Sequence, residues 1–297
     1  MTNENLISNL KKKISKNLRV EPVFKGADSE KKLDRYLLNQ TYLEYSKLKK
    51  IISINFLKEK PIGYIILNND KNIVGFLGTI FSYRNINQKN YLFCNLHTWI
   101  VDEKYRIHSY ILLLPILEEQ NVLTTFTPIN TLLGLYQKLG FQKIEMKYRI
   151  NLSLSFFKNE EFELSNDYNF YEKFLDEKCL KLYNDHLNFS CHKFFIYQKD
   201  NKNKNIFVIS KKNKRKFFMV LDLIYISDLN YLKENWIKIA PIIYSKYKIL
   251  FCGHKFINEN ECVLPKKLIF SKEVSSNICM KNLPNDYQFD TLYSEFI

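Results

Sequence analysis

Apolar and polar positions follow a regular order along the first half of the chain. Apolar runs at 63–67, 73–83 and 91–101 are separated by turns rich in asparagine, which predicts a meander of three strands. Apolar residues at helical spacing predict a helix within 30–52. Around them we expect a strand at 19–24, a helix from just after Arg106 to about 120 that is kinked at Pro115, a strand at 122–127, a helix from about 130 to 139, and a closing strand at 142–154.

The second half repeats this order after a weakly patterned, acidic stretch near 155–166. Strands at 206–210 and 217–226 flank a basic turn, and a helix over 231–247 leads to a strand at 249–252. We therefore expect an α/β (α+β) fold with mixed sheets and two domains, residues 1–155 and 156–297. The second domain is expected to be a degenerate structural copy of the first.

The charge balance bears on the class of partner. Lys and Arg number 45 against 31 Asp and Glu, a net charge of +14, which favours anionic partners. The lysines are nevertheless spread along the chain, and the excess of Lys, Ile, Asn, Tyr and Phe is what an AT-rich genome produces. The densest basic cluster, 211–216, lies between two apolar runs, as a solvated hairpin turn would. A nucleic-acid partner is therefore not expected.

Other classes of protein are disfavoured by what the chain lacks. It has no apolar run of the roughly 18–20 residues that span a bilayer, and its first residues do not follow a secretory signal pattern. The six cysteines form no Cys-x-x-Cys pair, and the five histidines are scattered. We expect a soluble, cytoplasmic protein with reduced thiols, no membrane span and no metal site.

Two short segments of the first half carry the candidate chemistry. Arg106-Ile-His-Ser-Tyr-Ile111 joins a predicted strand to a predicted helix, and the backbone N–H groups and positive dipole of a helix start favour a phosphate group there. Tyr136-Gln-Lys-Leu-Gly-Phe141 ends the next helix, with Gly140 placed as a C-terminal capping glycine and Phe141 as its hydrophobic partner.

At this spacing the two segments resemble those of the GNAT superfamily of acyl-CoA-dependent N-acyltransferases. The family's phosphate loop reads Arg or Gln, two residues, Gly, one residue, then Gly or Ala, and its later helix ends Tyr, three residues, Gly-Phe. Residues 136–141 match in full. The loop departs at Ser109, which is small and could add a hydroxyl donor, and at Ile111, which must point into the core for the loop to work. The resemblance covers about residues 60–150.

The resemblance implies acyl-CoA as co-substrate and assigns its contacts. The pantetheine arm would lie along the strand before the loop, against the main chain of Trp99 and Val101. Asn130 lies one residue from the family's CoA-contacting asparagine, and helix N-capping is an alternative role for it. The pyrophosphate would be held by Arg106 and by the backbone N–H groups of Ile107, His108, Ser109, Tyr110 and Ile111.

Catalytic roles are implied for three side chains. Strict alternation along 95–101 places Asn95, His97, Trp99 and Val101 on one face, so His97 is expected to face the bound thioester and to take the amine proton. Asn95 would orient the amine or a water. The resemblance makes Tyr136 the acid that protonates the departing thiolate. For His97 and Tyr136 alike, a packing role is the alternative.

The resemblance implies a small-molecule amine as the acceptor, and the best analogy is a nucleotide-linked amino sugar of surface polysaccharide synthesis. The turn at 226–232 of the second half lacks Arg and Gly and contains Asp228, so that half is expected to bind no CoA and to form a wall of the acceptor site. Two alternatives stay open: an aminoacyl-tRNA-dependent aminoacyltransferase of the cell-wall type, and a non-catalytic CoA- or nucleotide-binding module. The acyl group and the oligomeric state are left undecided.

Overall fold

A computed structural model describes residues 8, 10–12, 17–40, 44–119, 121–152, 161–266, 271–285 and 287–293. Contacts divide the chain into two compact units. The first comprises residues 1–144, 277–287 and 296–297, and the second comprises residues 145–276 and 288–295. The domain boundary expected at 155/156 falls within 153–160, outside the described residues.

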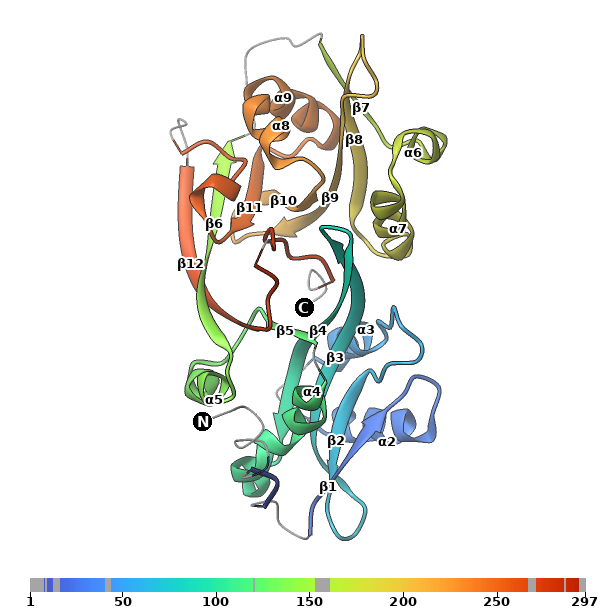
Figure 1. Ribbon diagram of the computed structural model, residues 1–297, viewed down its shortest axis with the longest axis vertical. Coiled ribbons are helices and arrows are strands. Elements are labelled where there is room, and N and C mark those ends of the chain that lie inside the picture. Colours follow the sequence, from blue (N-terminus) through green and yellow to red (C-terminus); the bar gives the residue numbers. More distant parts are fainter. Residues whose placement is uncertain are drawn as a thin grey trace. The chain divides into compact units, whose positions relative to one another are not determined.

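The first unit contains the expected meander. Its strands lie in the order β1-β2-β3-β4-β5-β12 (Figure 1), and every pairing is antiparallel except that of β4 with β5. The strands are β1 (Arg19–Val23), β2 (Gly63–Leu67), β3 (Ile73–Ile86), β4 (Lys89–Val101), β5 (Val122–Thr125) and the end of β12 (Ser271–Lys281).

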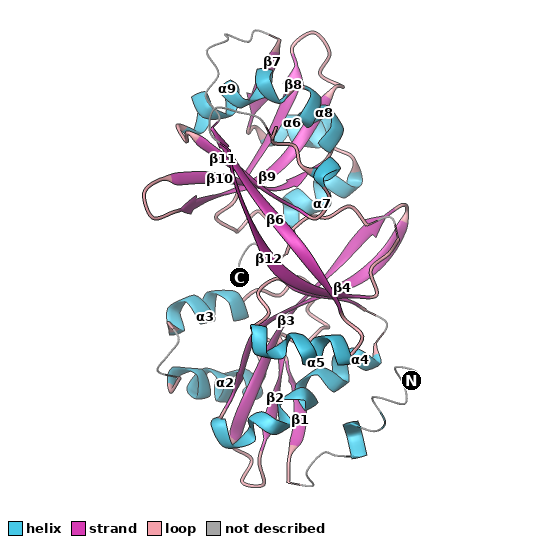
Figure 2. Ribbon diagram, turned by 90° about the vertical axis from the view of Figure 1, so that its left-hand side faces the viewer, coloured by secondary structure: helices cyan, strands magenta, loops and turns pink. Residues whose placement is uncertain are grey.

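Helices pack on both faces of this sheet. α2 (Asp28–Leu38) and α3 (Tyr45–Ile52) bury their apolar sides against one face. α4 (Leu114–Glu118) and α5 (Leu133–Lys138) adjoin the core on the other face. The single helix predicted within 30–52 is therefore two helices. Figure 2 shows all four as separate cyan segments.

The segment after β4 is a 3₁₀ helix, η1 (Glu103–Leu113), rather than the start of a long α-helix. The α-helical turns begin only at Leu114, and Pro115 stands in the first turn of α4. Proline fits there because the first N–H groups of a helix have no partner within it. Pro115 thus starts a helix, and the prediction that it kinks one is wrong.

The end of α5 follows the predicted capping pattern. Gly140 has a φ of 84°, in the left-handed region that favours glycine. The Gly140 N–H donates to the carbonyl of Gln137, and the Phe141 N–H donates to that of Tyr136, each at 3.0 Å. This pair of bonds is the Schellman motif, which fixes Tyr136 and Phe141 relative to each other.

The second unit repeats the strand order of the first. Its strands lie in the order β7-β8-β9-β10-β11-β6, and β10 with β11 is again the parallel pair. The strands are β7 (Phe162–Ser165), β8 (His192–Gln198), β9 (Asn205–Lys214), β10 (Met219–Ile226), β11 (Phe251–Phe256) and most of β6 (Gln142–Leu152). The helices are α6 (Tyr168–Phe174), α7 (Glu177–Asp185), α8 (Leu229–Glu234), α9 (Trp236–Tyr247) and the 3₁₀ turn η3 (Glu259–Glu261).

Each unit takes its closing strand from the other half of the sequence. β6 follows α5 along the chain, yet it pairs with β11 of the second unit from Lys147 to Leu152. β12 follows β11 along the chain, yet Cys279–Lys281 pair with β5 of the first unit. The sequence pattern located the closing strand at 142–154 but not the unit in which it lies.

Candidate functional site

The parallel strands β4 and β5 of the first unit separate partway along their length. They pair from Phe93 with Val122 to Asn95 with Thr124, and no later pair joins them. β4 continues to Val101, paired with β3 alone. From Leu96 onward, the edge of β4 that faces β5 is therefore open. We call this opening between β4 and β5 the notch, and it lies along the strand on which the GNAT resemblance places the pantetheine arm.

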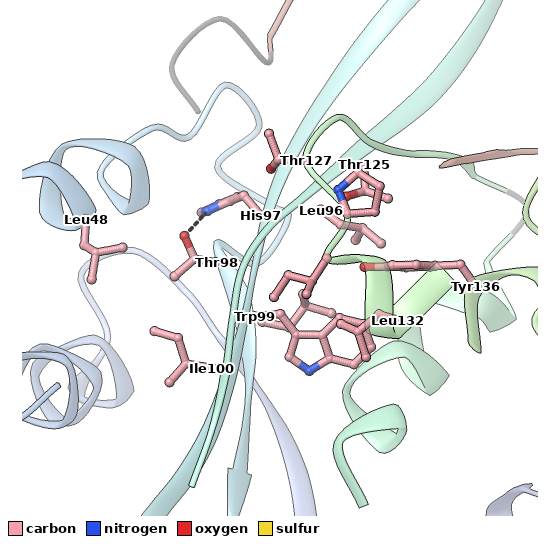
Figure 3. A pocket seen from close by; sticks show the side chains of 13 residues that line it. Leu48, Leu96, His97, Thr98, Trp99, Ile100, Thr125, Thr127, Leu132 and Tyr136 are labelled. Atoms are coloured by element: carbon pink, nitrogen blue, oxygen red, sulfur yellow. Dashed lines mark hydrogen bonds between the residues drawn. The ribbon is translucent and has the colours of Figure 1, made fainter. Parts of the chain in front are cut away.

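A pocket of about 270 Å³ lies in this notch. The described residues of its walls include no Lys, Arg, Asp or Glu and are mostly apolar. The lining residues are Leu48, Leu77, Leu96, His97, Thr98, Trp99, Ile100, Thr125, Thr127, Pro128, Ile129, Leu132 and Tyr136 (Figure 3). The sequence predicted His97, Trp99 and Tyr136 as site residues, and the structure brings these three together.

A β-bulge at Thr98 decides which way the residues of β4 point. Gly78 of β3 is paired with His97 and Leu77 with Trp99, so Thr98 is the extra residue, and its φ is 47°. An extra residue shifts the alternation of all the side chains that follow it. His97 therefore lies on the opposite side of β4 from Trp99 (Figure 3). The prediction that these two share a face is wrong, because it assumed a regular strand.

The His97 ring packs closely against Gly78 of β3. A Cβ atom on Gly78 would lie 2.2 Å from the Cε1 atom of the His97 ring, so that position needs glycine. The Nδ1 atom is 2.9 Å from the Thr98 hydroxyl, and Nε2 has no hydrogen-bond partner among the described residues. Burial lowers the pKa of His97 to about 3. At neutral pH, His97 is thus an uncharged hydrogen-bonding group. We expected it to be a base with a pKa near neutrality, and the structure does not provide such a base.

Tyr136 lies on α5, across the pocket from His97 (Figure 3). It is 3% exposed, and its ring packs edge-to-face on Trp99 and on Phe141, with centroids 5.8 and 5.0 Å away. The phenol is hydrogen-bonded to Thr125, and burial raises its pKa. Because of its raised pKa, Tyr136 is a protonated phenol at the pocket wall. Beside it, the indole Nε1 of Trp99 is buried without a hydrogen-bond partner among the described residues.

Two predicted polar residues lie elsewhere. The side-chain oxygen of Asn95 accepts a hydrogen bond from the Thr124 hydroxyl, where β4 and β5 part, and Asn95 does not line the pocket. Asn130 is exposed and is the first residue of the 3₁₀ turn η2 (Asn130–Leu132). The N-cap of that turn is Ile129, so the capping role considered for Asn130 is wrong.

The expected phosphate loop has a different backbone from the one predicted. In a 3₁₀ helix an N–H donates to the carbonyl three residues earlier, so η1 engages N–H groups that were expected to be free at 107–111. Arg106 and Ile107 are exposed, and His108, Ser109 and Tyr110 are half-buried. Ile111 is fully buried in the core, as the resemblance required. None of these residues lines the pocket.

The sequence reading missed Gly78 and Thr98, which shape the pocket. A glycine inside an apolar strand often marks a bulge or a close approach of another group. Gly78 stands in the run 73–83 and could have signalled both. A threonine with positive φ carries no comparable signal, because such backbone is uncommon for a β-branched residue.

In the described part of the chain, no group of three or more His, Cys, Asp or Glu side chains is placed to hold a metal ion. No helix within the same residues is long and apolar enough to cross a membrane.

No protein-family model matches the sequence, and no curated protein matches it. Solved structures do. A GCN5-related N-acetyltransferase from Anabaena variabilis superposes with a TM-score of 0.55 at 12% identity, covering 88% of this chain and 72% of that one. One from Kribbella flavida gives 0.54 at 10% identity, covering 89% and 70%. A GCN5-related glucosamine N-acetyltransferase region of a fungal multi-domain GH3 β-N-acetylglucosaminidase gives 0.52 at 11% identity, covering 90% and 38%. The chain has the fold of the GCN5-related N-acetyltransferases, the GNAT fold.

Proposed function

We propose that the protein is an acyl-CoA-dependent N-acyltransferase that moves an acyl group directly from the thioester to a primary amine. The observation that carries this proposal is the pocket between the diverging strands β4 and β5 in a chain with the GNAT fold. An extended pantetheine arm would add to the open edge of β4 as a further strand. The main chain of Trp99 and Val101 would supply its hydrogen bonds.

The proposed chemistry uses the two polar groups on opposite walls of the pocket. The amine nitrogen attacks the thioester carbonyl carbon, the C–N bond forms, and the C–S bond breaks. Tyr136 donates its phenolic proton to the departing thiolate, and the proton lost by the amine returns through water to restore the phenol. The Nε2 atom of His97 is buried without a hydrogen-bond partner among the described residues. In the proposed reaction it would accept a hydrogen bond from the amine and so orient the amine lone pair toward the carbonyl.

The phosphate end of CoA would meet η1. Arg106 is exposed there and provides a fixed positive charge. The backbone N–H groups of 107–111 would become phosphate donors only if this 3₁₀ segment rearranged on binding. We therefore expect Arg106 to contribute most of the contact with the pyrophosphate.

An amino sugar is a candidate acceptor. The fungal structural neighbour is a glucosamine N-acetyltransferase region, and at 11% identity its likeness concerns the fold. A nucleotide-linked sugar would also need cationic side chains for its diphosphate, and none is present in the part of the pocket wall that the structure describes. The amine of an unlinked sugar or of another small molecule fits this lining better than the nucleotide-linked form does.

Calorimetric titration with CoA tests the cofactor directly. We expect measurable heat and a rise in the midpoint of thermal unfolding, because a ligand that binds the native state stabilises it. Absence of both at millimolar CoA would refute the proposal. With binding established, release of free thiol from acetyl-CoA in the presence of a panel of amines would identify the acceptor.

A second candidate donor is an aminoacyl-tRNA. The hairpin between β9 and β10 exposes Lys212, Lys214, Arg215 and Lys216, with Phe217 83% exposed beside them. Basic side chains interleaved with an aromatic ring are a pattern that binds single-stranded nucleic acid. Binding of tRNA that weakens as salt rises would favour this donor, and no binding at low salt would exclude it.

A further inference from the structure

The pocket continues from one face of the first unit's sheet to the other. Leu96, Trp99, Leu132 and Tyr136 line it on the side of α5, where they belong to or pack against one hydrophobic core. Leu48 and Ile100 line it on the opposite side, in a separate core that contains α2 and α3. Figure 3 shows these two groups on either side of β4. Trp99 and Ile100 point to the two different sides because they are neighbours in a strand, and the bulge at Thr98 places His97 on the side of Ile100.

CoA would reach the pocket from the α5 side. The segment that follows β4 buries Ile111, Leu112 and Leu113 in the core of that face, so the proposed phosphate end lies there too. A pantetheine arm that starts at η1 and follows the open edge of β4 past Trp99 would place its sulfur at the notch. The thioester's acyl group would then point onward, to the side of Leu48 and Ile100.

That far end is suited to hydrocarbon. Leu48 and Ile100 are 7% and 4% exposed and belong to an apolar cluster. Two polar groups lie on this side: the Thr98 hydroxyl is 2.9 Å from Nδ1 of His97, and the buried Nε2 of His97 lies against Gly78. Among the described residues, no Lys, Arg, Asp or Glu side chain lines the pocket. A charged acyl group would lose its hydration at this end without gaining an ion-pair partner among the described residues.

We infer that the donor carries an apolar acyl chain longer than acetyl, and that Leu48 and Ile100 form the end wall that limits its length. This inference rests on the proposed function and adds the chemical class of the transferred group. The two side chains come from α3 and β4, so the length limit depends on how closely that helix packs against the strand.

Calorimetry with a series of thioesters tests the preference for an apolar acyl chain separately from the binding of CoA itself. The full chain is titrated with CoA, acetyl-CoA, butyryl-CoA, hexanoyl-CoA and octanoyl-CoA, without an amine. We expect affinity to rise about fourfold for each added methylene until the end wall is reached, then to level off or fall. If CoA binds and longer thioesters bind no tighter than acetyl-CoA, the inference is overturned while the proposed function stands. If CoA itself does not bind, the proposed function fails.

Variants of the end wall sharpen this test. Leu48→Phe should shorten the longest chain that gains affinity, and Leu48→Ala should lengthen it, with the affinity for CoA itself unchanged in both. Leu38→Phe, at an α2 position that is 58% exposed, is the matched control and should leave the whole series unchanged. Melting curves verify that each variant is folded. An unchanged chain-length limit in both folded Leu48 variants would remove Leu48 from the end wall.

Discussion

The two units share a strand order and a bulge but differ in where one pair of strands stops pairing. β4 is bulged at Thr98 against β3, and β10 is bulged at Ile224 against β9. In the first unit the parallel pair β4–β5 ends at Asn95, well before the bulge. In the second unit the parallel pair β10–β11 continues to Leu223, next to the bulge. The notch thus arises from an early end to strand pairing, on a topology that both units have.

Side chains reinforce the difference. In the second unit Asp222 of β10 accepts hydrogen bonds from Tyr148 and Asn213. A Cβ atom on Gly253 of β11 would lie 2.3 Å from the Asp222 carboxylate, so glycine is needed for this group to lie over β11. The turn after β10 differs as well, since the Asp228 carboxylate accepts from the N–H of Tyr231 at 2.9 Å and caps α8. A backbone donor at the start of α8 is thus satisfied by a side chain of the turn itself.

The largest expected effect tests the chemical role of the first unit. Tyr136→Phe should lower turnover by about 10²–10⁴-fold, the range for a lost proton donor, and leave the affinity for CoA nearly unchanged. The ring contacts with Trp99 and Phe141 remain in this variant. Steady-state kinetics and calorimetry measure the two quantities. Tyr83→Phe, at a position 43% exposed, is the control. Equal losses of turnover and affinity would indicate a packing role.

The next test concerns the packing of the His97 ring against Gly78. Gly78→Ala would drive a Cβ into the imidazole ring, and we expect it to cost about 1–3 kcal/mol of stability and to lower turnover as His97 moves. Gly134→Ala is the matched control, because a Cβ at that helical position meets nothing within 4 Å. It should be neutral or stabilising by up to about 1 kcal/mol. Chemical denaturation measures both. If the Gly78→Ala protein were as stable as the Gly134→Ala protein, the close contact described between His97 and Gly78 would be contradicted.

The pH dependence of stability follows from the same histidine. The pKa of His97 falls from 6.5 in the unfolded chain to about 3 in the folded protein, so between these values the unfolded state binds the extra proton. Stability should therefore fall as pH drops from 6.5 toward 3, by roughly 1 kcal/mol per pH unit from this group. His254 of the second unit, whose burial also lowers its pKa to about 3, adds a like contribution.

Replacing that histidine separates its contribution from that of the second unit. His97→Gln should reduce the slope of unfolding free energy against pH below 6.5, and His254→Gln is the comparison in the other unit. The shape of the activity profile between pH 5 and 8 should stay the same in His97→Gln, because the group does not titrate there. An activity profile that flattened in this variant would restore His97 as a base.

The smallest effect is expected in the second unit. Asp228→Ala should cost about 1 kcal/mol of stability through the lost cap of α8 and leave the affinity for CoA unchanged. Urea denaturation and calorimetry provide the two values. A change in CoA affinity in this variant would show that the turn after β10 takes part in binding and that the units are more alike than their strand pairing indicates.

Much of the fold could be predicted from the sequence, because alternation and capping are local signals. The strand at 63–67 was predicted at its observed bounds, and Gly140 has the positive φ and capping bonds expected of it. Three features could not be predicted from alternation and capping. The 3₁₀ course of 103–113 has no distinct periodic signal. The bulge at Thr98 interrupts the alternation and is signalled only by Gly78 of the neighbouring strand, and the exchange of β6 and β12 depends on contacts between residues far apart in sequence.

The same limits apply to the site. Tyr136 was identified from the motif that ends in Phe141, and Trp99 from its position in the strand before Arg106, and both line the pocket. The orientation of His97 was predicted wrongly because a single inserted residue reverses the face of a strand. Leu48 could not be connected with the pocket from sequence, since it reaches the site from a helix distant along the chain.

The exchanged strands have a consequence for biosynthesis. β5 of the first unit pairs with Cys279–Lys281, so the ribosome must translate nearly the whole second unit before the first can be finished. During that interval the edge of β5 has no strand beside it, and an unpaired edge is a template for aggregation. We expect a nascent chain arrested soon after Ile144 to need chaperone protection, and the two halves to become soluble together when they are expressed as separate polypeptides in one cell.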